Sequence, residues 1–135
     1  MASGWPWLYD EATFTNEVVI MSNQPTTPPK GLPGAHVAKV AEFIQYQDGA
    51  VVSRELVKRP GGTVTVFAFD EGQGLSEHTA PFDALAHVLE GEVEIHISGQ
   101  PHRVHGGEMI LMPAGQPHAL KAIQRFKMLL MMIRS

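Results

Sequence analysis

Residues 107–118 read GEMILMPAGQPH, and this stretch decides how the rest of the chain is interpreted. An apolar run, Met109–Met112, is followed by Pro113 and Gly115, and the stretch ends at His118. Proline gives a strand ladder no donor and glycine permits a positive φ, so these two residues bend the chain. The stretch therefore predicts a short β-strand, a tight turn and a second strand that begins at His118.

Side-chain alternation decides which residues of that second strand face inward. Residues 118, 120 and 122 share one face of a strand, and residues 119 and 121 share the other. Burying Lys121 would be the costlier choice, so we expect Lys121 to face water. His118, Leu120 and Ala122 then face the interior of the protein.

Short apolar runs separated by turn residues continue along the chain. Glycine and proline punctuate the sequence every 8–12 residues or so, which is typical of a sandwich or barrel. No convincing helix of ten or more residues interrupts this pattern. We therefore predict an all-β fold with one antiparallel barrel, built from runs that include residues 63–69, 84–90, 93–97, 109–112 and 126–133.

A second informative stretch, residues 72–91, reads GQGLSEHTAPFDALAHVLEG. Together the two stretches resemble the cupin family, whose motifs are G-x5-H-x-H-x3-4-E-x6-G and G-x5-P-x-G-x2-H-x3-N. The resemblance covers about residues 63–133 and implies a cupin-type antiparallel β-barrel, also called a double-stranded β-helix or jelly roll. The matching positions are Gly72, His78 and Gly91 in the first motif and Gly107, Pro113, Gly115 and His118 in the second.

The resemblance also implies a metal site, of which this chain retains half. In the family, two histidines and a glutamate of the first motif and the histidine of the second bind a divalent metal. His78 and His118 stand at ligand positions, whereas Ala80 and Ala84 stand where the other histidine and the glutamate belong. Ala122 replaces the asparagine that closes the second motif. The chain has no cysteine, so any metal would be held by histidine and carboxylate.

Three interpretations of the two missing metal ligands stay open. In the first, the metal site is lost, and His78 and His118 line an apolar pocket. In the second, Asp83 replaces the glutamate through a one-residue shift, which gives two histidines and a carboxylate around one divalent ion. Iron, manganese, nickel and zinc all suit that set. In the third, His87 is recruited, although alternation along residues 84–90 places it on the other face.

The alanines at the expected metal site leave room inside the barrel, and small barrels of this kind hold one small ligand. The methionines of the last strands adapt to irregular apolar shapes, so we expect the ligand to be small and largely apolar. The alternative is a mononuclear metal-dependent enzyme, a dioxygenase, isomerase or lyase, that uses His78, His118 and Asp83. The predicted pocket consists of His78, His118, Ala80, Ala84, Met112 and Leu120.

The last apolar run, Phe126–Ile133, is apolar on both faces. A strand buried on both sides in so small a protein needs a cover for its outer face, because an exposed apolar strand is an aggregation hazard. A second subunit is the expected cover, so we predict a homodimer. A pure assembly module without any ligand is a third hypothesis, and it rests on this strand alone.

Composition and charge exclude other classes of protein. The formal net charge is −4 and no Lys/Arg cluster exceeds two residues, which argues against nucleic-acid binding. No run of about 18 apolar residues is present to span a membrane. The lack of cysteines and of a secretory signal fits a cytoplasmic protein. Residues 1–35 are expected to form an N-terminal extension with a Pro-rich arm, and residues 36–135 the barrel domain.

Overall fold

The computed structural model describes residues 31–134, whose strands form two facing sheets and confirm the all-β prediction. These residues include no helix that is long and apolar enough to cross a membrane. Most of the predicted N-terminal arm, residues 1–30, lies outside the described residues. The elements are the 3-10 helix Val40–Phe43 and the strands β1 Val51–Arg59, β2 Gly62–Phe69, β3 Gly74–His78, β4 Asp83–Glu90, β5 Glu92–Ile97, β6 Gln100–His105, β7 Met109–Met112, β8 His118–Ala122 and β9 Phe126–Ile133.

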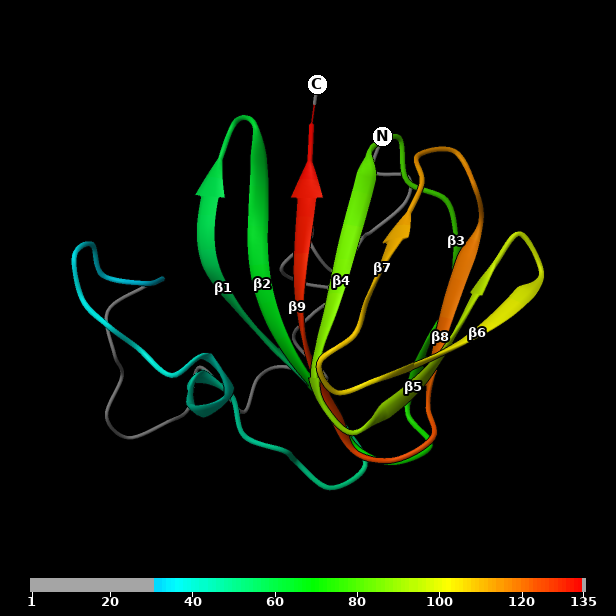
Figure 1. Ribbon diagram of the computed structural model, residues 1–135, viewed down its shortest axis with the longest axis horizontal. Helices are drawn as coiled ribbons and strands as arrows, with labels where there is room; N and C mark the ends of the chain where they lie inside the picture. Colours follow the sequence, from blue (N-terminus) through cyan, green and yellow to red (C-terminus); the bar gives the residue numbers. More distant parts are fainter. Residues whose placement is uncertain (1–30, 135) are drawn as a thin grey trace.

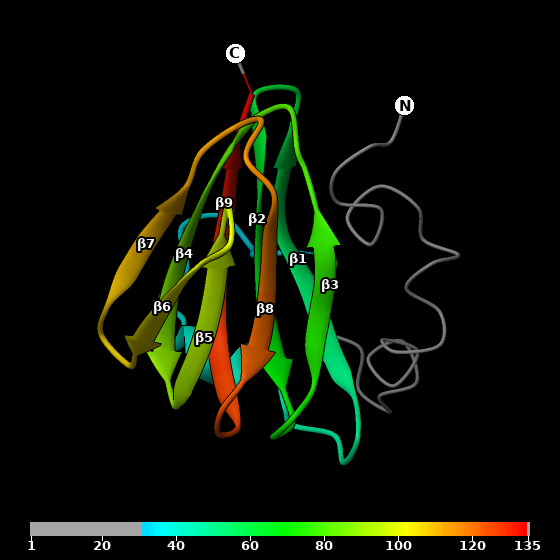
Figure 2. The ribbon, with the colours of Figure 1, turned by 90° about the vertical axis from the view of Figure 1, so that its right-hand side faces the viewer.

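The strands follow jelly-roll topology. One sheet has five strands in the order β1-β2-β9-β4-β7, and the other has four in the order β3-β8-β5-β6 (Figure 1). All neighbouring strands are antiparallel. Seen from the side of the four-stranded sheet, the two sheets enclose one core (Figure 2). The last strand in the sequence, β9, therefore occupies the centre of the larger sheet.

Strict alternation divides the side chains between the core and the outside. On β8, His118, Leu120 and Ala122 are buried and Lys121 is exposed, as the sequence predicted. On β4, Ala84 and the residues that alternate with it are buried, and those between them are exposed or half-buried. The interior of the barrel is therefore built mainly from every second residue of each strand, with register shifts on β1, β3 and β4.

The two ends of the barrel interior differ in size and polarity. At the end where β4 finishes, the rings of Phe69 and Phe126 stack with centroids 4.5 Å apart, and Phe67 lies beside them. At the end where β4 begins, the interior positions hold smaller and polar side chains, among them Ala84 and Thr63. Aromatic rings therefore fill one end of the barrel, and the polar interior side chains lie towards the other end.

Residues before β1 cover part of the outer face of the five-stranded sheet. Ile44 packs into a second apolar cluster there, against side chains that include Val66 and Leu129. Lys127 is buried beneath this segment, where its Nζ donates a 2.7 Å hydrogen bond to the carbonyl oxygen of Ala41. The Tyr46 hydroxyl donates a 2.6 Å hydrogen bond to Glu90. These contacts hold the segment on the sheet.

Gly91, in the turn between β4 and β5, is required by both conformation and space. Its φ is +83°, a region that side chains other than glycine rarely adopt. A Cβ at this position would overlap the carbonyl oxygen of Arg125 and the backbone and Cβ of Phe126. Gly99 has a similar φ of +82°, but a Cβ there would meet no atom within 4 Å.

We expect Gly91→Ala to destabilise the fold much more than Gly99→Ala. The left-handed conformation alone costs about 1–2 kcal/mol with alanine, and forcing a methyl group into packed backbone adds about 1–3 kcal/mol. Urea denaturation followed by circular dichroism measures both variants. Equal losses of unfolding free energy in the two variants would show that the close packing at Gly91 is absent.

Candidate functional site

The two histidines that the motifs single out lie together at one end of the barrel. β3 ends at His78, β8 begins at His118, and the two residues are paired across the neighbouring strands. Their ring centroids are 5.1 Å apart with the planes at 80°, so the rings meet edge to face. His118 is fully buried and His78 is half-buried. The expected histidine pair therefore exists.

A backbone carbonyl orients the His78 ring. The Nδ1 atom of His78 lies 2.7 Å from the carbonyl oxygen of Ser76, which can only accept, so this nitrogen carries the proton and donates. In the neutral ring the lone pair is then on Nε2. The His78 ring is thus held in one orientation by the segment next to it.

Burial keeps both rings uncharged at neutral pH. It lowers the pKa of His78 below its ordinary value of 6.5, although the hydrogen bond to Ser76 opposes the shift. Burial lowers the pKa of His118 to about 4, and the nearby charge of a protonated His78 lowers it further, against the opposing hydrogen bond to Gln116. The pair therefore presents neutral imidazoles to the interior.

The remaining residues of the predicted pocket also face the core. Ala80 and Ala84 are completely buried, and Ala84 pairs with Met112 of β7. Leu120 is buried beside the histidines and pairs with Leu75. The segment between β3 and β4 is tied to the β7–β8 turn by a 2.8 Å hydrogen bond from the Gly115 N–H to the Ala80 carbonyl. The predicted pocket residues thus share one end of the barrel.

Two buried hydroxyls at the same end were not expected from the sequence. Thr63 and Thr65 face the interior from β2, where they pair with Met132 and Leu130 of β9, and they are 4% and 1% exposed. Neither hydroxyl has a hydrogen-bond partner among residues 31–134. An unpaired buried hydroxyl costs about 1–3 kcal/mol. The sequence contains a signal for this burial, because Thr63 and Thr65 alternate along the strand with the same period as the apolar Phe67 and therefore share its face.

Asp83 and His87, the other proposed metal ligands, are not part of this end of the interior. Both lie on β4 in alternation with the buried Ala84, so they belong to the outer face of the sheet. One carboxylate oxygen of Asp83 accepts a 2.8 Å hydrogen bond from the Ala114 N–H. Within residues 31–134, no group of three or more His, Asp or Glu side chains could hold a metal ion.

The donor set therefore does not match a resident catalytic metal. His78 and His118 offer two nitrogens, and the positions of the remaining family ligands hold Ala80 and Ala84. Catalytic sites of this kind usually take about three protein ligands, and alanine supplies none. The side chains at this end of the barrel leave such a site incomplete.

Two hollows lie outside the barrel. One, of about 410 Å³, is apolar and lies between residues 32–43 and the outer face of β1, β2 and β9. The other, of about 280 Å³, lies on the outer face of the four-stranded sheet and includes Glu77, His96 and Lys121. Neither hollow contains a residue of the histidine pair. The polar groups of the interior are thus separate from both.

The sequence profile of the cupin domain matches residues 65–134, which include both histidines and most of the strands. The chain belongs to the cupin family. No curated protein sequence matches it. Family membership establishes the barrel, a fold that can bind small molecules or metals. The activity depends on the residues of the site and does not follow from the fold alone.

Several solved structures resemble this chain over most of its length. A conserved protein of unknown function from Streptococcus pyogenes is 35% identical, with a TM-score of 0.74, over 83% of this chain and 98% of that one. A cupin superfamily protein from Desulfitobacterium hafniense is 27% identical, with a TM-score of 0.73, over 78% and 97%. A cupin 2 conserved barrel domain protein from Leptotrichia buccalis is 41% identical, with a TM-score of 0.68, over 70% of this chain but only 46% of its own length.

We expect the free energy of unfolding to fall as the pH drops from about 7 towards 4. The unfolded chain takes up protons at His78 and His118 near their ordinary pKa of 6.5, whereas the folded protein, with lowered pKa values, does not. The contribution of the two histidines to this loss should level off below the folded pKa of His118, about 4. Urea denaturation at a series of pH values measures this dependence.

In the variant His118→Gln, whose side chain cannot gain a proton, the free energy of unfolding should depend less steeply on pH. His102→Gln, at an exposed position on β6, is the matched control and should leave this dependence unchanged. An unchanged slope in His118→Gln would contradict a neutral, buried His118.

Proposed function

We propose that this cupin binds one small, largely apolar molecule inside the barrel, at the end that holds His78 and His118. The observation that carries this proposal is a set of polar groups in an apolar interior. The hydroxyls of Thr63 and Thr65 are buried without a partner among the described residues, at the end of the barrel where two neutral imidazoles lie. A ligand that brings a polar atom to this end would offset the cost of burying them.

The chemistry of the interior supports a particular kind of ligand. Among residues 31–134, no carboxylate or lysine is buried in the interior at this end, so a strongly charged ligand would find no opposite charge there. Threonine hydroxyls both donate and accept, and they suit the oxygen of an alcohol, a phenol or a neutral acid. Met112 and Met132 are flexible enough to mould around an apolar body. The proposed ligand therefore has one polar end and an aromatic or aliphatic remainder.

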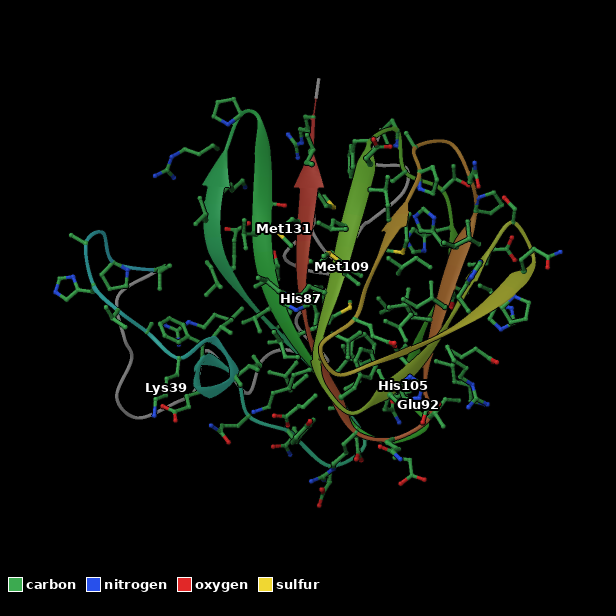
Figure 3. All side chains as sticks on the ribbon, viewed as in Figure 1. Lys39, His87, Glu92, His105, Met109 and Met131 are labelled. Atoms are coloured by element: carbon green, nitrogen blue, oxygen red, sulfur yellow. The ribbon has the colours of Figure 1, made fainter. Side chains whose placement is uncertain are left out.

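The methionines allow a direct test, because some face the interior and others the outside. Met112 and Met132 are buried, whereas Met109 and Met131 lie on the outer face (Figure 3). With methionine methyl groups labelled with ¹³C, we expect benzyl alcohol, 1-hexanol or phenol to shift the NMR signals of Met112 and Met132. Shifts confined to Met109 and Met131, or no shift with any of these probes, would contradict binding in the barrel.

Isosteric variants of the threonines give the matched control for this experiment. Thr63→Val and Thr65→Val remove an unpartnered hydroxyl, so each should raise the free energy of unfolding by about 1 kcal/mol or more. The same variants should weaken binding of whichever probe shifts the interior methionines. Thr63→Ser keeps the hydroxyl and should bind as the wild type does. A loss of stability in both valine variants would show that the hydroxyls already have partners.

A metal-dependent enzyme remains the second candidate, favoured by one observation. His78 is fixed by a hydrogen bond from Nδ1 to a backbone carbonyl, which is how metal-ligating histidines are commonly oriented. We nevertheless expect only loose metal binding, because two histidines are the whole donor set at this end. After dialysis against EDTA, soaking with iron, manganese, nickel or zinc and gel filtration, elemental mass spectrometry should find less than one ion per chain.

One tightly held ion per chain would overturn this expectation. If that ion were lost in both His78→Ala and His118→Ala, the enzyme alternative would replace the binding proposal. Asp83→Asn would then show whether the carboxylate moves inward to complete the site.

A further inference from the structure

The larger of the two outer hollows, of about 410 Å³, has walls of a single chemical kind. We call it the apolar hollow. One wall comes from residues 32–43 and the other from the outer face of β1, β2 and β9. Apart from His36, the described residues that line it are apolar, namely Leu32, Val37, Ala38, Val40, Phe43, Leu56, Val57, Val64 and Leu129. The apolar hollow is therefore suited to apolar side chains.

The described part of the chain leaves large side chains of this hollow in contact with water. Val37 is fully exposed and Leu32 is 41% exposed. Concave apolar surfaces of roughly 300–1,000 Å³ are the usual size of binding sites in proteins. Apolar side chains that gather at such a surface indicate that something packs against them.

The chain outside the described residues joins the structure at the rim of the apolar hollow. The Leu32 N–H donates a 2.8 Å hydrogen bond to the carbonyl oxygen of Leu56, and both residues line the hollow. Gly31 has a φ of +77°, and a Cβ there would lie 2.8 Å from the same oxygen. These contacts fix the chain beside β1. Residues 1–30 are therefore attached next to the hollow.

We propose that Trp5 and Trp7 of the same chain pack into the apolar hollow. They belong to the stretch Trp5–Tyr9, which reads WPWLY. Proline restricts the residue before it to extended conformations, and residues two apart in an extended chain project to the same side. Pro6 thus favours the projection of both indole rings towards one surface. Each ring buries about 150–250 Å² when it packs, which suits a hollow of this size.

The length of the attached chain selects this stretch. The prolines at 25, 28 and 29 favour an extended stretch that rises about 3.1 Å per residue and leads the chain roughly 20 Å away from Gly31. About six more residues, at about 3.3 Å each, bring the chain back over that distance. Residues 1–18 can therefore reach the hollow, and Trp5–Tyr9 is the most aromatic stretch among them.

The charges of the two segments are complementary. Residues 1–22 carry three acidic residues and neither Lys nor Arg. Residues 31–41 carry the exposed Lys39 and no acidic residue, and Lys39 lies between two residues that line the hollow. Asp10 and Glu11 directly follow the aromatic stretch. Packing of the tryptophans would bring these two carboxylates towards Lys39, which favours the docked arrangement.

Intrinsic fluorescence of the full chain tests the proposal, because Trp5 and Trp7 are the two tryptophans of the sequence. We expect emission at a shorter wavelength than in the urea-unfolded chain, and quenching by acrylamide several-fold weaker. Dilution should change neither, because the contact lies within one chain. Emission and quenching equal to those in urea would overturn the proposal, and so would a shift that is lost on dilution.

Leu32→Glu and Val37→Glu place a carboxylate at the hollow, and both positions are exposed, so the variants should fold. Each should move emission and quenching towards the values in urea, because docking would now bury a charge. Met109→Glu is the matched control, since it alters an exposed apolar side chain outside the hollow and should match the wild type. Tryptophans that stay protected in both hollow variants would contradict the proposed docking.

Nuclear Overhauser contacts give a second measurement that does not depend on a variant. In methyl-labelled protein, the indole protons should contact the methyl groups of Val57, Val64 and Leu129. Indole contacts confined to other methyl groups would overturn the proposal. This inference is independent of the proposed ligand site, because the hollow lies outside the barrel and contains neither histidine of the pair.

Discussion

The two-residue repeat of the β-strands is the constraint on which the rest of this structure depends. On β4 and β9 it sends one set of side chains into the barrel and the other onto the outer face of the sheet. A register slip of one residue would exchange the two sets. It would expose Ala84 and its neighbours and carry Asp83 and His87 inward. The interior site and the apolar outer face are therefore two consequences of the same register.

Strands made of a continuous apolar run could be predicted from the sequence, whereas β1 and β6 could not. Runs such as Met109–Met112 and Phe126–Ile133 are rich enough in apolar residues to be recognised directly. β1 and β6 mix apolar with charged and polar residues, and β6 contains Pro101. Both lie at sheet edges, where one side of the backbone faces water and charged residues are tolerated. Their pairing depends on the neighbouring strand more than on their own composition.

The site was predictable where spacing along a strand fixes it. Motif spacing and alternation together bring His78 and His118 to one end of the barrel. Asp83 does not face the interior, because it directly precedes the inward Ala84 and neighbouring side chains of a strand point to opposite faces. The burial of the Thr63 and Thr65 hydroxyls depends on what the opposite sheet presents to them. That information lies in the packing of the two sheets and not in any one segment.

The position of β9 also determines the order in which this protein can fold. It lies between β2 and β4, yet it leaves the ribosome after the other eight described strands. Until it arrives, β2 and β4 each have an unsatisfied inner edge, and the five-stranded sheet remains in two halves. Pairings this distant in sequence slow folding and expose apolar strands in the meantime. A nascent chain that stalls before residue 126 would therefore hold every strand but the one that joins the halves.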